Sequence, residues 1–301
     1  MRIRKPGKVR DGIWYFGREE SGVYLLEGDR SAMIISGGMS YIVSDILQQL
    51  KEFGRSENRI EKLLILHSHF DHVGIVPFFK RRLPAMEVHA SQRAWEILQM
   101  DKAVVTINEF GRSMARRMER QDVYSAHDLE WRKDVSGKTV REGDRIDLGG
   151  LEVVILEIPG HSSCCIAAYV PGLKALFPTD GGGIPFRQTI VSSGNSNYTK
   201  YQQSLERLKP LEVDYLCADH YGYVIGPEAN AFLSKSVEMA KENRAQMEAV
   251  YRSTRDIEAA ARKLTTSFYE ENPDYFLSPE IFLDVHRQMV RHLAAAIEGE
   301  G

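Results

Sequence analysis

Short apolar runs separated by glycine-containing turns fill the first part of the chain. They predict strands over residues 13–16, 23–26 and 32–35. Between residues 40 and 53 the apolar positions recur every three or four residues, which predicts a helix. The apolar run 62–66 is typical of a buried strand, and it leads directly into the polar segment 67–74. This pattern predicts an α/β body.

Residues 91–134 carry a helical pattern that separates two β-rich regions. The apolar positions lie three or four residues apart, at Val104, Ile107, Phe110, Met114 and Met118. Arginines lie between them, at Arg112, Arg116, Arg117 and Arg120. We expect this stretch to be a helical insertion or lid, and a packed surface helix is the alternative.

Strand-like segments return after residue 134, and the composition changes again after Gly226-Pro227. Beyond this point the apolar spacing predicts helices at about 228–252, 255–269 and 279–298. Ser278 followed by Pro279 is typical of a helix start. The predicted organisation is an α/β domain over 1–227 and an all-helical C-terminal cap over 228–301.

Composition narrows the class of protein. Of the 301 residues, 43% are hydrophobic and 27% are charged, which is ordinary for a globular protein and excludes a largely disordered chain. No apolar run approaches the roughly 20 residues of a membrane helix, so we expect no membrane partner. The formal net charge of −3 argues against a dedicated nucleic-acid binder, which normally carries a basic excess.

The cysteines and the chain start bear on the cellular compartment. Three cysteines, of which Cys164 and Cys165 are adjacent, cannot form a disulfide framework in a chain of this size. The basic start is not followed by the apolar stretch of a secretory signal. We therefore expect a reducing, cytoplasmic setting, with the cysteines as small packed residues rather than catalytic thiols.

The segment 67–74 carries the most informative chemistry. It reads His-Ser-His-Phe-Asp-His-Val-Gly and places three histidines and an aspartate within six residues. Imidazole and carboxylate are ligands for zinc, iron or manganese. Residues two apart in an extended segment point the same way, so His67 and His69 are able to share one metal. His72 is out of phase with them and is able to face a second metal.

Three more metal-competent residues follow later apolar strands. His161 comes after the segment 151–158, Asp180 after 174–177 and His220 after 213–218. Ligands delivered by several strand ends form a rigid site that loops decorate. We therefore group these three residues with the first motif.

The seven positions together resemble the signature of the metallo-β-lactamase fold superfamily. That signature is HxHxDH followed by a separate His, Asp and His, and here it falls on His67, His69, Asp71, His72, His161, Asp180 and His220. The segment 158–162 also resembles the TPGHS element of the superfamily, and 176–180 resembles its LFxGD element.

This resemblance implies a fold, a cofactor and roles. The implied fold is a four-layer αββα sandwich, and the implied cofactor is a pair of divalent metal ions about 3.5 Å apart, as zinc, iron or manganese. Each ligand has an implied role: His67, His69 and His161 hold the first metal, Asp71, His72 and His220 hold the second, and Asp180 bridges the two.

Within the superfamily, the chain most resembles the quinolone-signal response subfamily. The similar features are Gly37-Gly38-Met39-Ser40, the run 72–77, the helical insertion and the C-terminal helices. This resemblance implies an esterase or thioesterase that acts on a small acyl substrate. Two alternatives stay open: a phosphodiesterase for a nucleotide or small RNA that uses the arginines near residue 116, and a regulatory protein that keeps the metal fold.

The expected mechanism uses a hydroxide that bridges the metals, because two cations lower the pKa of a shared water far below 15.7. Asp71 is the candidate catalytic residue that orients this nucleophile and shuttles a proton. Tyr221 and Tyr223 are candidate substrate contacts that donate to the oxyanion, and packed loop aromatics are the alternative. A homodimer is the default expectation for a soluble oligomer.

Overall fold

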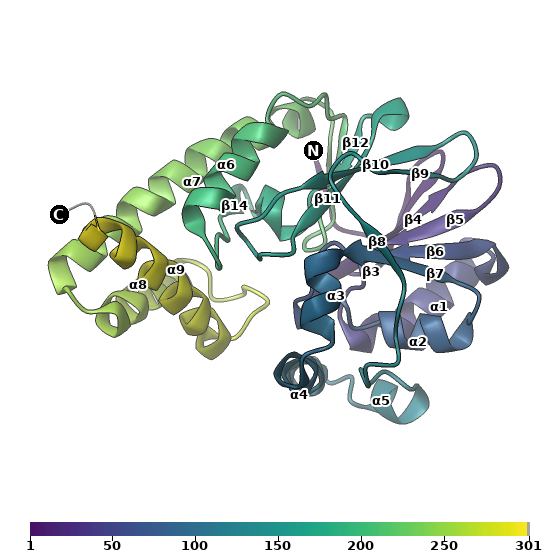
Figure 1. Ribbon diagram of the computed structural model, residues 1–301, viewed down its shortest axis with the longest axis horizontal. Coiled ribbons are helices and arrows are strands. Elements are labelled where there is room, and N and C mark those ends of the chain that lie inside the picture. The colour runs from purple at the N-terminus through teal and green to yellow at the C-terminus, as the bar shows by residue number, and fades with distance from the viewer. Residues whose placement is uncertain (300–301) are drawn as a thin grey trace. The chain divides into compact units, whose positions relative to one another are not determined.

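The computed structural model describes residues 1–299 of the chain (Figure 1). The chain forms two compact units whose segments alternate along the sequence. The first unit comprises Met1–Glu157, Cys164–Thr179 and Glu212–Asn230. The second comprises Ile158–Ser163, Asp180–Leu211 and Ala231–Gly301. A single cut in the chain therefore cannot separate the two units.

One seven-stranded sheet of the first unit has the order β2-β3-β4-β5-β6-β7-β8. The pairs from β2 to β5 are antiparallel, and the pairs from β5 to β8 are parallel. The strands are β2 (Gly7–Arg10), β3 (Ile13–Arg18), β4 (Ser21–Glu27), β5 (Ala32–Ile35), β6 (Ile60–Leu64), β7 (Glu87–Ser91) and β8 (Lys138–Val140).

The other seven-stranded sheet of the first unit has the order β1-β16-β15-β12-β11-β10-β9. Its pairs are antiparallel apart from β12 with β15. The strands are β1 (Arg2–Ile3), β9 (Arg145–Asp147), β10 (Glu152–Glu157), β11 (Ile166–Val170), β12 (Ala175–Phe177), β15 (Tyr215–Cys217) and β16 (Tyr223–Ile225).

The two sheets share an apolar core. Side chains alternate along a strand, so Tyr15 on β3 and Tyr24 on β4 face this core together with their neighbours two residues away. From the opposite sheet come Val153 and Phe177, and the Phe177 ring lies edge-on to the Tyr24 ring at 5.2 Å. The first unit is therefore a sandwich of two sheets.

Five α-helices of the first unit flank the sheet of β2–β8. They are α1 (Val43–Glu52), α2 (Val76–Arg82), α3 (Gln92–Leu98), α4 (Asp101–Arg117) and α5 (Asp122–Ala126). Figure 1 shows α1, α2 and α3 on the face of this sheet that is turned away from β9–β12. α1 buries Val43, Ile46 and Leu50 on one side, as its helical spacing predicts.

The expected helical stretch 91–134 consists of α3, α4 and α5 followed by irregular chain. Ile107 and Met114 on α4 are buried. Phe110 on the same helix lies edge-on to Phe70, with ring centroids 5.3 Å apart. α4 is thus a packed helix beside the short 3₁₀ turn η3 (Phe70–His72), which carries two of the predicted ligands.

The second unit contains a small hairpin and most of the C-terminal helices. Its elements are β13 (Ile184–Phe186), β14 (Thr189–Val191), α6 (Tyr198–Leu208), α7 (Pro227–Thr254), α8 (Ile257–Glu271) and α9 (Pro279–Gly299). Tyr201 and Leu205 on α6 share an apolar core with Leu264 on α8 and Val290 on α9. At the start of α9, the Ser278 hydroxyl accepts a hydrogen bond from the Ile281 backbone N–H at 3.3 Å, which confirms the predicted cap.

The α/β class and the helical C-terminal region are confirmed by the structure. The sequence pattern did not predict α2, β7, or the hairpin of β13 and β14. The domain boundary near residue 227 stays a prediction.

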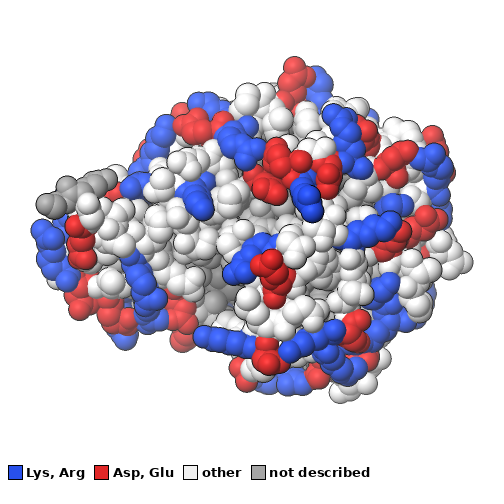
Figure 2. All heavy atoms as spheres, in the orientation of Figure 1, with Lys and Arg blue, Asp and Glu red and all other residues white. Residues whose placement is uncertain are grey.

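Among residues 1–299, no helix combines the length and apolar character that crossing a bilayer requires. On the face shown in Figure 2, Lys and Arg side chains are interspersed with Asp and Glu side chains. Mixed charges of this kind are typical of a solvated surface.

Candidate metal centre

The first unit brings five predicted ligands to the ends of its strands. His67 and His69 follow β6, and Asp71 and His72 lie on the turn η3 directly after them. His220 follows β15 of the opposite sheet. His69 is half-buried and the other four are buried. His67 and His69 belong to one group of side chains able to hold a metal ion.

Asp71, His72 and His220 form the part of a second such group that lies in the first unit. The Nε2 atoms of His72 and His220 are 3.3 Å apart. Asp71 Oδ2 lies 3.5 Å from each of these two nitrogens. Three potential ligand atoms from opposite sheets therefore converge on one point.

The hydrogen bonds on the far side of the two rings fix their tautomers. His220 Nδ1 lies 2.7 Å from the backbone oxygen of Glu20, which only accepts, so Nδ1 is the donor. His72 Nδ1 lies 2.8 Å from Asp219 Oδ2 and donates to that carboxylate. In the neutral rings both Nε2 atoms then carry lone pairs that face each other.

This arrangement fits a divalent cation. Two imidazole lone pairs and a carboxylate oxygen facing one point repel one another unless a positive charge lies between them. Neutral imidazole and carboxylate ligands suit zinc, iron and manganese. Metal-binding histidines commonly donate their other ring N–H to a carboxylate or a backbone oxygen, as His72 and His220 do here.

The protonation state of Asp71 agrees with this role. Burial alone would raise the pKa of its carboxyl group, but His72 and His220, when positively charged, hold the pKa well below its usual value. A cation bound between neutral rings would act on the carboxyl group in the same direction. Asp71 is therefore ionised at neutral pH, as a metal ligand or a general base must be.

Asp219 and Thr179 are further polar residues behind the ligands, and the sequence analysis missed both. Asp219 directly precedes His220, and Thr179 directly precedes Asp180. Thr179 Oγ1 lies 2.6 Å from Asp219 Oδ2 and 3.1 Å from His67 Nδ1. Their positions directly before two predicted ligands are the sequence feature that could have identified them.

The second unit carries the other two predicted ligands. His161 and Asp180 are both buried, and both are candidate metal ligands. His161 Nε2 lies 3.4 Å from Asp180 Oδ2. His161 Nδ1 donates to the backbone oxygen of Ser193 at 2.7 Å, so its Nε2 is also the nitrogen left to bind a metal.

A sequence profile of the metallo-beta-lactamase superfamily matches residues 17–220, which is more than half of the chain and includes all seven predicted ligands. The chain belongs to the metallo-beta-lactamase superfamily. Its α/β fold is the one predicted from the sequence, and membership supports a metallohydrolase with a site for divalent metal. The helical C-terminal region beyond residue 220 lies outside the matched segment.

Individual relatives are distant. The chain is 23% identical over 217 residues to metallo-beta-lactamase fold-containing protein ST1585 of Sulfurisphaera tokodaii, with 70% of this chain and 76% of that protein covered. It is 25% identical over 207 residues to a hydroxyacylglutathione hydrolase of Prochlorococcus marinus, with 66% and 64% covered.

A solved structure resembles nearly the whole chain. It is the metallo-beta-lactamase family protein TTHA1429 of Thermus thermophilus, with a TM-score of 0.68, 16% identity, and coverage of 97% of this chain and 95% of that one. At this identity the likeness shows the fold alone.

The predicted substrate contacts lie in different surroundings. Tyr223 on β16 is buried in the core between the two sheets of the superfamily fold, where its ring lies 6.0 Å from that of Tyr15. Tyr221 is buried, with its backbone N–H donating to Glu19 O at 2.6 Å and Arg4 over its ring. Their part in oxyanion binding stays a prediction.

The cysteines are packed residues. Cys164, Cys165 and Cys217 are buried and form no disulfide. Burial raises the pKa of the Cys217 thiol well above its usual value, which disfavours the nucleophilic thiolate.

Two of the four arginines of the helical stretch form ion pairs with acids. Arg112 forms an ion pair with Glu130, and Arg120 Nη2 lies 3.1 Å from Asp45 Oδ2. Arg112 also lines a polar cavity of about 500 Å³ in the first unit, together with Glu130, Arg132 and residues 124–129. Each of the two arginines thus has its charge matched by a carboxylate of the protein.

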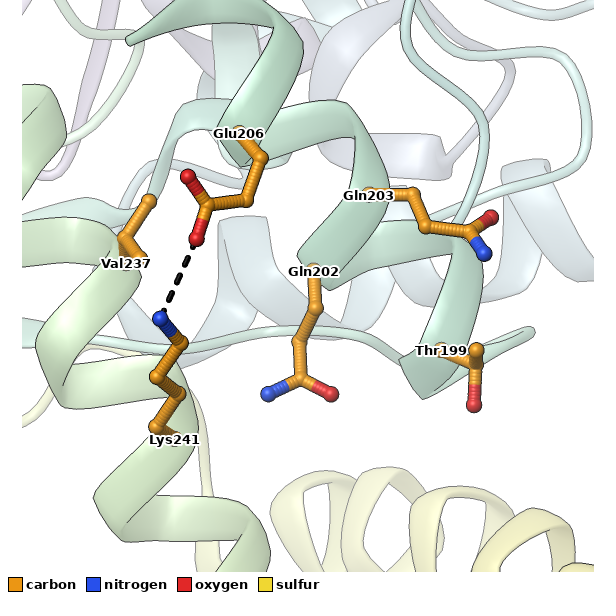
Figure 3. A pocket seen from close by; sticks show the side chains of 6 residues that line it. All are labelled: Thr199, Gln202, Gln203, Glu206, Val237 and Lys241. Carbon is orange, nitrogen blue, oxygen red and sulfur yellow. Dashed lines mark hydrogen bonds and ion pairs between the residues drawn. The ribbon is translucent and has the colours of Figure 1, made fainter.

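A cavity of about 400 Å³ in the second unit lies between α6 and α7 (Figure 3). Its lining residues are Thr199, Gln202, Gln203, Glu206, Val237 and Lys241. Lys241 Nζ forms an ion pair with Glu206 Oε1 at 3.1 Å. None of these residues belongs to the two candidate groups of metal ligands.

Proposed function

We propose that the protein is a metal-dependent hydrolase that cleaves the ester or thioester bond of a small acyl substrate. The observation that carries this proposal is the convergence of Asp71 Oδ2 with the Nε2 atoms of His72 and His220. Membership of the metallo-beta-lactamase superfamily supports the same chemistry.

The proposed metal ligands are the seven residues of the motif. His67, His69 and His161 would hold one divalent ion, Asp71, His72 and His220 would hold a second, and Asp180 would bridge them. Zinc, iron and manganese all suit this donor set. When bound, two such ions supply hydroxide at neutral pH and polarise the substrate carbonyl.

The chain's own residues then position the reactants. Asp71, ionised at neutral pH, orients the attacking water through its carboxylate and accepts the proton that the water gives up. The backbone and carboxylate acceptors behind His72 and His220 keep both rings in one orientation during turnover.

Aromatic side chains in and beside the segment 67–74, here called the metal loop, favour an acyl substrate. Phe70 lies on η3, next to Asp71, and Phe110 of α4 packs edge-on against it. Both rings are half-buried and therefore retain exposed apolar surface. Such a surface suits an acyl chain, and the name of the hydroxyacylglutathione hydrolase relative points to thioester chemistry.

The arginine pairing weakens the phosphodiesterase alternative. A phosphate-binding row needs cations that are available to the ligand. Arg112 and Arg120 are already bound to Glu130 and Asp45. With two of the four arginines taken up by acids, the row offers a phosphate fewer cations, which favours the acyl substrate.

The decisive assay compares initial hydrolysis rates on an acyl thioester and an activated phosphodiester. Zinc-, iron- and manganese-loaded protein is measured against chelator-treated protein. We expect chelator-sensitive thioester turnover well above the phosphodiester rate. A higher phosphodiester rate, or thioester turnover that survives chelation, would refute the proposal.

A pair of variants tests whether Phe110 forms an apolar wall of the substrate site. Phe110→Ala removes a ring beside the metal loop and is expected to raise KM for the thioester roughly tenfold with little change in kcat. Val105→Ala on the same helix is the control, because Val105 is 53% exposed and packs on little. An unchanged KM for Phe110→Ala would show that Phe110 does not contact the substrate.

A further inference from the structure

Asp219 is a buried carboxylate that the proposed chemistry does not use directly. It is 2% exposed and lies in the loop between β15 and β16. Its Oδ2 accepts two hydrogen bonds, one from His72 Nδ1 at 2.8 Å and one from Thr179 Oγ1 at 2.6 Å. A buried ionic group of this kind is costly unless its partners compensate it.

Thr179 links Asp219 to a second histidine through hydrogen bonds. Because the Thr179 hydroxyl donates its only proton to Asp219, its oxygen acts as the acceptor towards His67 Nδ1, 3.1 Å away. The resulting chain runs from His67 through Thr179 to Asp219 and is joined there by His72. One carboxylate is thus linked to a histidine of each candidate metal group.

The backbone of Thr179 shows that this placement is demanding. Its φ is +45°, in the left-handed region that a β-branched residue rarely adopts. Such strain persists where the surroundings over-determine a conformation, and it clusters at functional sites. A glycine or asparagine would suit the backbone better but would not place this hydroxyl between His67 and Asp219.

We propose that Asp219 is a positioning residue shared by both metals. It holds His72 directly and His67 through Thr179, so that both rings present Nε2 to their metals. Its negative charge makes both imidazoles better ligands. This inference rests on the proposed metal centre, but it needs no assumption about the substrate.

The expected behaviour of the two residues differs. Asp219→Asn keeps the shape of the side chain and removes its charge, so we expect the affinity for both metals to fall by about 10- to 100-fold. Thr179→Val removes the link to His67 and one of the two hydrogen bonds that Asp219 Oδ2 accepts, but it keeps the direct bond from His72 to Asp219. We therefore expect a loss of affinity of about tenfold for the metal held by His67, and a smaller loss for the other metal. Thr179→Ser keeps the hydroxyl and is expected to bind both metals as the native protein does.

Zinc titration of the chelator-stripped full chain, followed by calorimetry and chelator competition, measures both affinities. His69→Ala and His220→Ala identify which binding step belongs to which group. Asp11→Asn is the matched control, because the Asp11 side chain is 90% exposed. Native protein that binds no zinc would refute the proposed function itself.

Long-range proton–nitrogen spectra of ¹⁵N-histidine-labelled, zinc-loaded protein give a readout independent of affinity and turnover. Asp219→Asn should shift the Nδ1 signals of both His67 and His72, and Thr179→Val should shift mainly that of His67. The inference is overturned if Asp219→Asn lowers the affinity for only one of the two metals, or if Thr179→Val lowers both affinities equally. It is also overturned if Thr179→Ser behaves like Thr179→Val. If the native protein hydrolyses no thioester but the variants show these affinity losses and Nδ1 shifts, the inference about Asp219 stands and the substrate assignment is rejected.

Discussion

Gly74 is a position where one added carbon should disturb the metal loop. It lies two residues after His72, and its backbone N–H donates to Gly38 O at 2.7 Å. A Cβ at this position would lie 2.2 Å from the backbone nitrogen of Ser40 and 2.7 Å from the backbone carbon of Met39. Ordinary contacts begin at 3.4 Å, and neither neighbour is a side chain that can rotate away.

The magnitude follows from this geometry. In Gly74→Ala the two backbone segments must separate by roughly 1 Å, since protein interiors are close-packed. Overpacking of this kind costs about 3 kcal/mol, which lowers Tm by about 5 °C in a chain of this size. His72 moves with the segment, because its backbone oxygen accepts from Gly37 N–H at 2.9 Å. Zinc affinity should therefore fall as well.

Thermal melts with and without zinc measure both effects, because bound metal raises Tm by an amount that depends on its affinity. Gly172→Ala is the matched control, since a Cβ at Gly172 meets nothing within 4 Å. The control should melt like the native protein. A Gly74→Ala variant with native Tm and the native zinc-induced shift would refute the close-approach argument.

Two further changes test the centre and the helical region. Asp180→Asn should lower metal content and hydrolysis rate together, because it removes a charge 3.4 Å from His161 Nε2, and unchanged metal content and rate would reject a bridging role. Burial lowers the pKa of His286 to about 4 against 6.5 for the ordinary side chain, so the unfolded chain takes up a proton first as pH falls. This histidine should therefore reduce the free energy of unfolding by about 2 kcal/mol between pH 7 and pH 5. His286→Gln, compared with the native protein by denaturant titration at both pH values, should lose that part of the pH dependence, and an equal dependence in the two proteins would contradict it.

The metal loop was readable from the sequence because its chemistry is local. Three histidines and an aspartate within six residues, directly after an apolar run, need no knowledge of the fold. The supporting residues are different. Asp219 lies 147 residues from His72, and Thr179 lies 112 residues from His67, so only the folded sheets bring them together.

The missed elements have local causes. The strand β13 contains Pro185, and proline within a short apolar run argues against a strand. α2 is seven residues long, which is too short for a helical period to stand out. The long helices α7 to α9 were predicted to within a few residues because several turns of apolar spacing support each of them.

The shared core of α6 with α8 and α9 has a consequence for synthesis of the protein. The α6 residues of this core, Tyr198, Tyr201 and Leu205, leave the ribosome well before Ile297, which packs against the same core from α9. At a translation rate of about 5–20 residues per second, part of this apolar face stays uncovered for on the order of 10 s. During that interval we expect nascent α6 to expose an apolar face of the kind that chaperones bind. Synonymous codons that slow translation of residues 209–297 should then increase aggregation without changing the finished protein.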